Sequence, residues 1–135
     1  MIALDTSVAV AAALPWHENH ATALSTLREA KTPLIAQVAV ETYSVLTRLP
    51  PPQRVPAQLA LDYLRQAFIL PPVTLTSERY MGLLDRAAGE DITGGAVYDA
   101  IVAATAREAG ATLVTLDQRA IPTYQRVGTA YQLVR

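Results

Sequence analysis

Short apolar segments alternate with longer helical stretches along the whole chain, and this alternation is the feature that most constrains its fold. The segments with the composition of strands are residues 2–4, 33–36, 69–75, 112–116 and 129–134. Strands that are joined by helices in this way form a parallel sheet with helices on both faces. We therefore expect one three-layer α/β/α domain over residues 1–135, with a central parallel sheet of four to five strands.

The helices between these strands are marked by apolar spacing and by residues that start or stop a helix. The predicted helices are 7–14, about 18–30, 38–49, 56–68, one that begins at Ser77, 96–108 and a short one from Asp117. Pro56 suits the first position of its helix, and Gly110 stands where a helix ends. Two prolines in the third strand place it at a sheet edge, because proline cannot donate a ladder hydrogen bond.

The composition excludes several classes of protein. Hydrophobic residues make up 51% of the 135 residues and charged residues 17%, which favours strands that are covered on both faces. The net charge of -1 leaves nucleic-acid binding to a local basic patch. The chain has no cysteine for a disulfide or a thiolate site. Asp5 interrupts the first apolar run, and no stretch reaches the roughly 20 apolar residues of a membrane span. We expect a cytoplasmic protein without a membrane partner.

Four acidic residues stand at the ends of otherwise apolar segments: Asp5 in ALDTS, Glu41 in AVETY, Asp99 in VYDAI and Asp117 in TLDQR. A carboxylate among such neighbours is costly to bury unless another group compensates it. Asp5 and Asp117 follow predicted strands, and ligands of parallel sheets bind beyond the carboxyl ends of the strands. These acids are therefore candidates for one shared site.

Each acid taken singly also has a structural interpretation. Asp5, Asp99 and Asp117 stand near helix starts, where aspartate is a favoured N-cap. Glu41 fits such an interpretation least, because no Lys or Arg lies three or four residues away to pair with it, although its side chain could point to solvent. Taken together, carboxylates that converge at one sheet edge repel one another unless a cation lies among them.

An all-oxygen set of ligands selects Mg²⁺ or Mn²⁺ rather than Zn²⁺. Such an ion keeps several waters, lowers the pKa of one of them and stabilises a leaving oxygen. The chemistry that fits these residues is hydrolysis of a phosphodiester without a side-chain nucleophile.

The ordered motifs resemble those of PIN-domain ribonucleases. They are D-T-S after the first strand, a lone Glu in the third helix, G-G-A-V-Y-D-A at the start of an apolar helix, and T-L-D after the next strand. In length and arrangement the chain looks like the VapC toxin of VapBC-type (type II) toxin–antitoxin systems. The resemblance implies a metal-dependent endoribonuclease that cuts RNA, usually tRNA or rRNA. It also implies a homodimer and silencing by a cognate antitoxin.

The resemblance assigns an acidic quartet that is both catalytic and metal-binding: Asp5, Glu41, Asp99 and Asp117. Within this quartet Asp5 and Asp99 are expected as principal ligands of Mg²⁺ or Mn²⁺, and the other two acids would hold a second ion or the water. The hydroxyl residues expected to hydrogen-bond the quartet are Thr6 or Ser7, and Thr115.

Several residues outside the quartet are candidates for contacts with partners. Arg119 is the best candidate for an RNA phosphate because it follows Asp117 by two residues, and further candidates are Arg48, Arg54 and Arg86. An ordinary solvated arginine explains each of them equally well. Trp16 and Tyr43 could stack on a base, but packing in the core or in a dimer is the simpler interpretation. The apolar helix 56–68 fits part of an antitoxin groove or a plain core helix.

Two other functions share parts of this pattern. A receiver-type phosphoacceptor domain binds Mg²⁺ at the edge of a similar sheet, but it needs adjacent acids after the first strand and a lysine after a late strand. Asp5 has no acidic neighbour, and Lys31 lies elsewhere. A non-catalytic PIN-like module that binds RNA or protein usually lacks one or more acids, and here all four are present. The sequence favours the nuclease.

Overall fold

The computed structural model describes residues 1–29 and 31–135, so Ala30, the last residue of the second predicted helix, lies outside the described residues. The strands are β1 (Ile2–Leu4), β2 (Pro33–Ile35), β3 (Ile69–Val73), β4 (Thr112–Thr115) and β5 (Tyr131–Leu133). The helices are α1 (Thr6–Ala13), α2 (His20–Glu29), α3 (Ala36–Arg48), α4 (Ala57–Ala67), α5 (Ser77–Gly89), α6 (Ala96–Glu108), the 3₁₀ turn η1 (Gln118–Ala120) and α7 (Ile121–Val127). None of these helices is long and apolar enough to cross a bilayer.

In the described residues every strand pair is parallel, but the strands form two sheets instead of the one sheet that we expected. One sheet has the order β1-β4-β5, and in the other β2 pairs with β3. β1 and β2 contact each other without a ladder between them. β2 is short, contains a proline without an N–H, and its register with β3 shifts between Pro33 and Ile35. Within the part of the chain that the structure describes, β3 pairs with β2 alone, so the strand with two prolines lies at an edge, as predicted.

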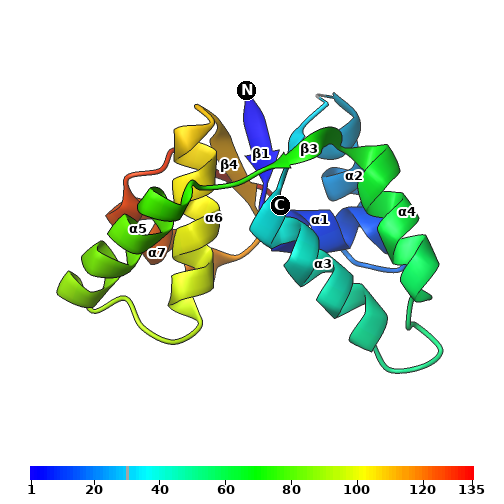
Figure 1. Ribbon diagram of the computed structural model, residues 1–135. Helices are drawn as coiled ribbons and strands as arrows, with labels where there is room; N and C mark the ends of the chain where they lie inside the picture. The colour runs from blue at the N-terminus through cyan, green and yellow to red at the C-terminus, as the bar shows by residue number, and fades with distance from the viewer. Residues whose placement is uncertain (30) are drawn as a thin grey trace.

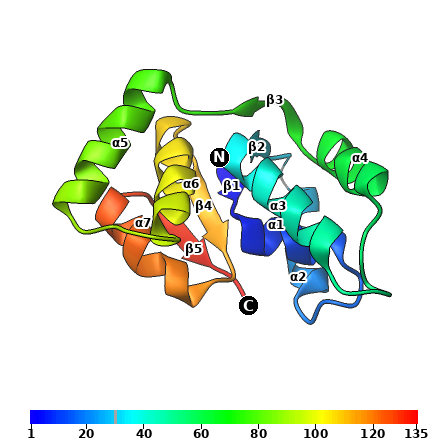
Figure 2. The ribbon, with the colours of Figure 1, turned by 60° about the horizontal axis from the view of Figure 1, so that its bottom comes forward.

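Helices lie on both sides of the strands. Figure 1 shows α1 to α4, coloured blue to green, on one side of β1 and β4, and α5 to α7 on the other. Figure 2 shows the same two groups from below, with β3 running across from α4 towards α5. The predicted α/β arrangement of parallel strands and covering helices is therefore confirmed.

The buried core joins the strands to both groups of helices. Its strand residues Leu4, Ile35, Leu113 and Val114 are almost completely buried, and each contributes about 1.5–3 kcal/mol by leaving water. The helices that pack on them present small side chains, which allow close approach: Ala9, Ala11, Ala12, Ala100, Ala103 and Ala106. Gly110 follows α6 with a φ of 70°, a conformation that favours glycine, so the predicted helix end is confirmed.

Candidate active site

Asp5 stands where β1 ends and α1 begins. Its backbone N–H donates to the carbonyl of Val114 in β4 at 3.0 Å, and its Oδ1 accepts from the N–H of Val8 at 3.3 Å. The N-cap interpretation is therefore correct for Asp5. The side chain is only 3% exposed, however, and capping a helix does not require a carboxylate to be buried so deeply.

Hydroxyl groups from three elements surround the Asp5 carboxylate. Ser7 Oγ donates to Oδ1 at 2.5 Å, and the Tyr124 hydroxyl of α7 donates to Oδ2 at 2.7 Å. Burial raises the pKa of Asp5, while hydrogen bonds from Ser7, Thr115 and Tyr124 oppose that rise. Burial and the charge of Asp5 raise the pKa of Tyr124, so its hydroxyl keeps the proton that it donates. Asp5 is held in one orientation by α1, β4 and α7.

The hydroxyls of Ser7 and Thr115 also connect the turn that carries Asp117 to the turn that carries Asp5. Ser7 Oγ accepts from the backbone N–H of Leu116 at 2.9 Å, and Thr115 Oγ1 accepts from the N–H of Asp117 at 2.9 Å. Asp117 caps η1 by accepting from the N–H of Arg119 at 3.0 Å. The Arg119 guanidinium lies 3.6 Å from Asp117 Oδ1, and its side chain is 94% exposed.

Glu41 reaches the start of α1 from α3. Its Oε2 accepts from Thr6 Oγ1 at 2.5 Å, and its Oε1 accepts from Gln37 Nε2 at 3.2 Å. Thr6 is the first residue of α1 and follows Asp5 directly. Glu41 therefore points towards the predicted site and not into open solvent.

Asp99 lies in the first turn of α6, whose N-cap is Gly95, so the capping interpretation is wrong for this acid. Burial raises its pKa to about 6, together with the negative charges of Asp117, Glu41 and Asp5 in that order. One charge changes the pKa of another group only when the two lie close together. The carboxylates of Asp117, Glu41 and Asp5 therefore lie near Asp99, and the four predicted acids, from four separate segments, share one region.

The acids suit a divalent cation by their chemistry but do not close around one. No group of three or more Asp, Glu or His side chains in residues 1–29 and 31–135 is arranged to hold an ion. Asp5 and Glu41 direct oxygens at hydroxyls, and the repulsion that raises the pKa of Asp99 also favours separation of the carboxylates. Carboxylate oxygens are nevertheless the ligands that Mg²⁺ and Mn²⁺ prefer. Metal binding and the catalytic roles of these residues stay predictions.

Tyr124 and Gln37 contact the quartet although neither was predicted from the sequence, and Tyr124 is the buried one of the two. Tyr124 stands seven residues after Asp117 in a short helix, and its side chain is 1% exposed. A buried tyrosine hydroxyl needs a hydrogen-bond partner, which is the one signal that the sequence offers. The sequence does not say that this partner is Asp5.

Three other expectations are revised by the structure. Trp16 and Tyr43 are 58% and 39% exposed, so packing in the core is wrong for both, and packing in a dimer stays a prediction. The Arg86 guanidinium pairs with Glu90 at 2.8 Å and donates to the carbonyl of Val127 at 3.2 Å, so it serves the fold instead of standing free for RNA.

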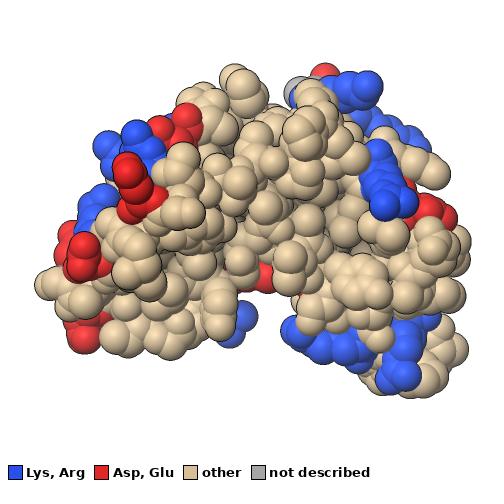
Figure 3. Space-filling view, in the orientation of Figure 1, with Lys and Arg blue, Asp and Glu red and all other residues tan. Residues whose placement is uncertain are grey.

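The charge pattern of one face is visible in Figure 3, where acidic atoms lie at the base of a hollow between the two groups of helices. Basic side chains flank this hollow on both sides. The basic surface on the α3 side covers the C-terminal end of that helix, where Arg48 lies in the last turn and Arg54 donates to the carbonyl of Leu49 at 2.8 Å. Basic side chains on both sides of the hollow can bind the phosphates of a nucleic acid, while the acidic side chains at its base can bind a cation.

The parallel strands and the ordered acids define a known class of protein. The sequence model of the PIN domain matches residues 2–126, and the chain belongs to the PIN-domain family. Ribonuclease VapC40 from Mycobacterium tuberculosis is 48% identical over 134 residues, covering 99% of each chain. Ribonuclease VapC27 from the same organism is 41% identical over 128 residues, covering 94% of this chain and 92% of the relative. The predicted resemblance to VapC proteins is confirmed.

A solved structure shares the fold at low identity. The crystal structure of FitAcB from Neisseria gonorrhoeae aligns with a TM-score of 0.67 and 18% identity, covering 97% of this chain and 96% of that one. This similarity supports the fold assignment alone.

Proposed function

We propose that the chain is a metal-dependent endoribonuclease, the toxin of a type II toxin–antitoxin pair, which hydrolyses phosphodiester bonds of tRNA or rRNA. The observation that carries this proposal is the convergence of the four acids. Ser7 and Thr115 tie the turn of Asp117 to that of Asp5, and Glu41 accepts from Thr6, which follows Asp5 directly. Burial and the charges of Asp117, Glu41 and Asp5 raise the pKa of Asp99, which agrees with this placement. Uncompensated carboxylates destabilise one another, so their concentration in one place favours a site for a cation. The relatives at 48% and 41% identity are named ribonucleases, which supports RNA as the substrate.

Mg²⁺ or Mn²⁺, when bound, supplies Lewis-acid chemistry: it lowers the pKa of the attacking water and neutralises charge on the phosphate. We assign Asp5 and Asp99 as its principal ligands, and Glu41 and Asp117 to a second ion or to orientation of the water. The hydroxyl donors around Asp5 and Glu41 keep these side chains directed towards the site. No side chain needs to attack the phosphorus.

RNA binding is assigned to the basic rims of the hollow in Figure 3. The net charge of -1 provides no general attraction for RNA, so local arginines must supply the phosphate contacts. Arg119 is our first candidate because its exposed guanidinium lies beside Asp117. Arg48 and Arg54 are the candidates on the α3 side.

The antitoxin is proposed to bind a groove between α1, α2 and α4. This groove has a volume of about 510 Å³, and apolar Leu24, Leu27 and Ala67 line it together with Arg28 and Lys31. An antitoxin segment with apolar and acidic side chains complements that lining. Co-purification with the product of a short neighbouring gene tests this partner. Light scattering of the purified protein tests the proposed homodimer.

The nuclease itself is tested by incubating the purified protein with total RNA and Mg²⁺, Mn²⁺ or EDTA. We expect cleavage with either metal, none in EDTA, and none by Asp5→Asn or Asp99→Asn, which remove a charge at nearly constant volume. Asp85→Asn, an exposed change on α5, is the matched control and should cut at the parental rate. An Asp5→Asn variant that cuts as fast as the parent refutes the metal mechanism. A folded parent that binds RNA without cutting it under any condition indicates the non-catalytic PIN-like module.

A further inference from the structure

Tyr124 brings α7 into contact with the acidic quartet. Its buried hydroxyl donates to Asp5 Oδ2 at 2.7 Å. We propose that Tyr124 is a positioning residue, which holds the Asp5 carboxylate in the orientation that a divalent cation requires. This inference rests on the proposed function and deepens it, because it adds a residue that binds neither the cation nor RNA.

The two oxygens of Asp5 are fixed from different elements. Ser7 and Val8 of α1 donate to Oδ1, and Tyr124 of α7 donates to Oδ2. Without the Tyr124 hydroxyl, Oδ2 loses its donor from α7, and the carboxylate is held less firmly by its other donors Ser7, Val8 and Thr115. Groups that hydrogen-bond metal ligands orient them, and their loss typically lowers metal affinity or activity by roughly 10- to 100-fold.

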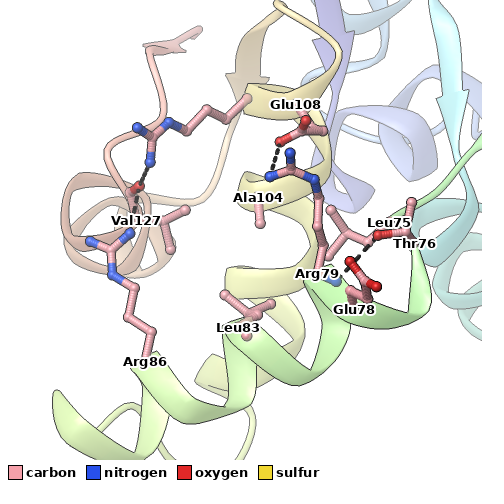
Figure 4. A pocket seen from close by; sticks show the side chains of 11 residues that line it. Leu75, Thr76, Glu78, Arg79, Leu83, Arg86, Ala104, Glu108 and Val127 are labelled. Carbon is pink, nitrogen blue, oxygen red and sulfur yellow. Dashed lines mark hydrogen bonds and ion pairs between the residues drawn. The ribbon is translucent and has the colours of Figure 1, made fainter.

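The helix that carries the tyrosine is itself anchored at its C-terminal end. The carbonyl of Val127 accepts from Arg86 of α5 at 3.2 Å and from Arg107 of α6 at 3.0 Å. Figure 4 shows Arg86 extending from α5 to this carbonyl. Gly128 then ends α7 with a φ of 80°. Cationic donors stabilise the C-terminus of a helix. The Arg107 contact thus joins α7 to α6, the helix that carries Asp99 in its first turn.

The change Tyr124→Phe tests the proposal because it removes one hydroxyl and keeps the ring. We expect the affinity for Mn²⁺, measured by calorimetry without RNA, to fall by roughly 10- to 100-fold. We expect kcat to fall at limiting Mn²⁺ and to recover in excess Mn²⁺. KM for RNA should stay unchanged, because a buried side chain does not touch the substrate.

The change Tyr63→Phe is the matched control. The Tyr63 hydroxyl also donates at 2.7 Å, but to the backbone carbonyl of Ala9. Tyr63→Phe should therefore lower the melting temperature without changing the Mn²⁺ affinity. In an Asp5→Asn background, Tyr124→Phe should cause no further loss of Mn²⁺ affinity, because the hydroxyl acts through that carboxylate.

Unchanged Mn²⁺ affinity in Tyr124→Phe, or an equal loss in Tyr63→Phe, overturns the positioning role. A parent protein that binds Mn²⁺ but cuts no RNA refutes the proposed function, and the affinities of the two variants still decide the role of Tyr124. A parent that neither binds Mn²⁺ nor cuts RNA overturns both.

Discussion

Asp99 carries a charge that the metal-free fold disfavours, so neutralising this residue should stabilise the protein. Its pKa is raised to about 6 from the ordinary value of 3.8. At about 1.4 kcal/mol per pH unit, this difference corresponds to at most about 3 kcal/mol. Asp99 is partly open to solvent, which screens the repulsion. We therefore expect Asp99→Asn to raise the free energy of unfolding at pH 7.5 by roughly 1–2 kcal/mol.

The contribution of Asp99 to the free energy of unfolding depends on pH in a definite direction. Because burial and neighbouring charge raise the pKa of Asp99 in the folded state, the folded protein binds its proton more tightly than the unfolded chain does. The parent therefore loses stability as the pH rises from about 4 to about 6. Below about pH 4 the carboxyl is protonated in both states, and parent and variant should be equally stable.

Urea unfolding in EDTA between pH 4 and pH 8 measures this difference, with Asp85→Asn as an exposed control that should match the parent. Added Mn²⁺ should stabilise the parent more than Asp99→Asn, because the variant lacks a proposed ligand. The reasoning is refuted if Asp99→Asn is no more stable than the parent at pH 7.5. It is equally refuted if the advantage of the variant persists at pH 4.

Three further changes test separate contacts. Ser7→Ala removes a donor to Asp5 and an acceptor for the Leu116 N–H. It should therefore lower the free energy of unfolding in urea titrations by about 1–3 kcal/mol, and an unchanged value would contradict these contacts. Arg119→Gln should weaken RNA binding in EDTA and reduce the slope of log affinity against log salt by roughly 0.7–1, and an unaltered slope would exclude a phosphate contact. Gly128→Ala should lower the free energy of unfolding by about 1 kcal/mol in the same urea assay, because a φ of 80° favours glycine. Equal stability of variant and parent would contradict the left-handed conformation at the end of α7.

The helices were predictable because their signals are local. Helix 96–108 was predicted with the bounds that α6 has, since Gly95 and Gly110 bracket a strongly apolar segment. The division of the strands into two sheets was not predictable, because it depends on strand pairing. The irregular register between Pro33 and Ile35 is a property of how two strands meet, and one strand alone does not encode it.

The residues of the candidate site were predictable where their positions follow from the order of strands and helices, and not where they depend on how helices pack. The topology of parallel strands brings Asp5 and Asp117 to one edge, so their proximity follows from the order of elements. The contacts of Thr6 with Glu41 and of Tyr124 with Asp5 depend instead on how α3 and α7 pack. No local pattern reports those packing angles, which is why the tyrosine was found only in the structure.

The central claim is that four distant acids gather to hold one or two divalent cations. Crystals grown with saturating Mn²⁺ and measured for anomalous scattering test it most directly. We expect a strong peak bound by Asp5 and Asp99, with Glu41 or Asp117 beside it. A bound Mn²⁺ ion away from all four carboxylates, or no peak at saturating Mn²⁺, would contradict it.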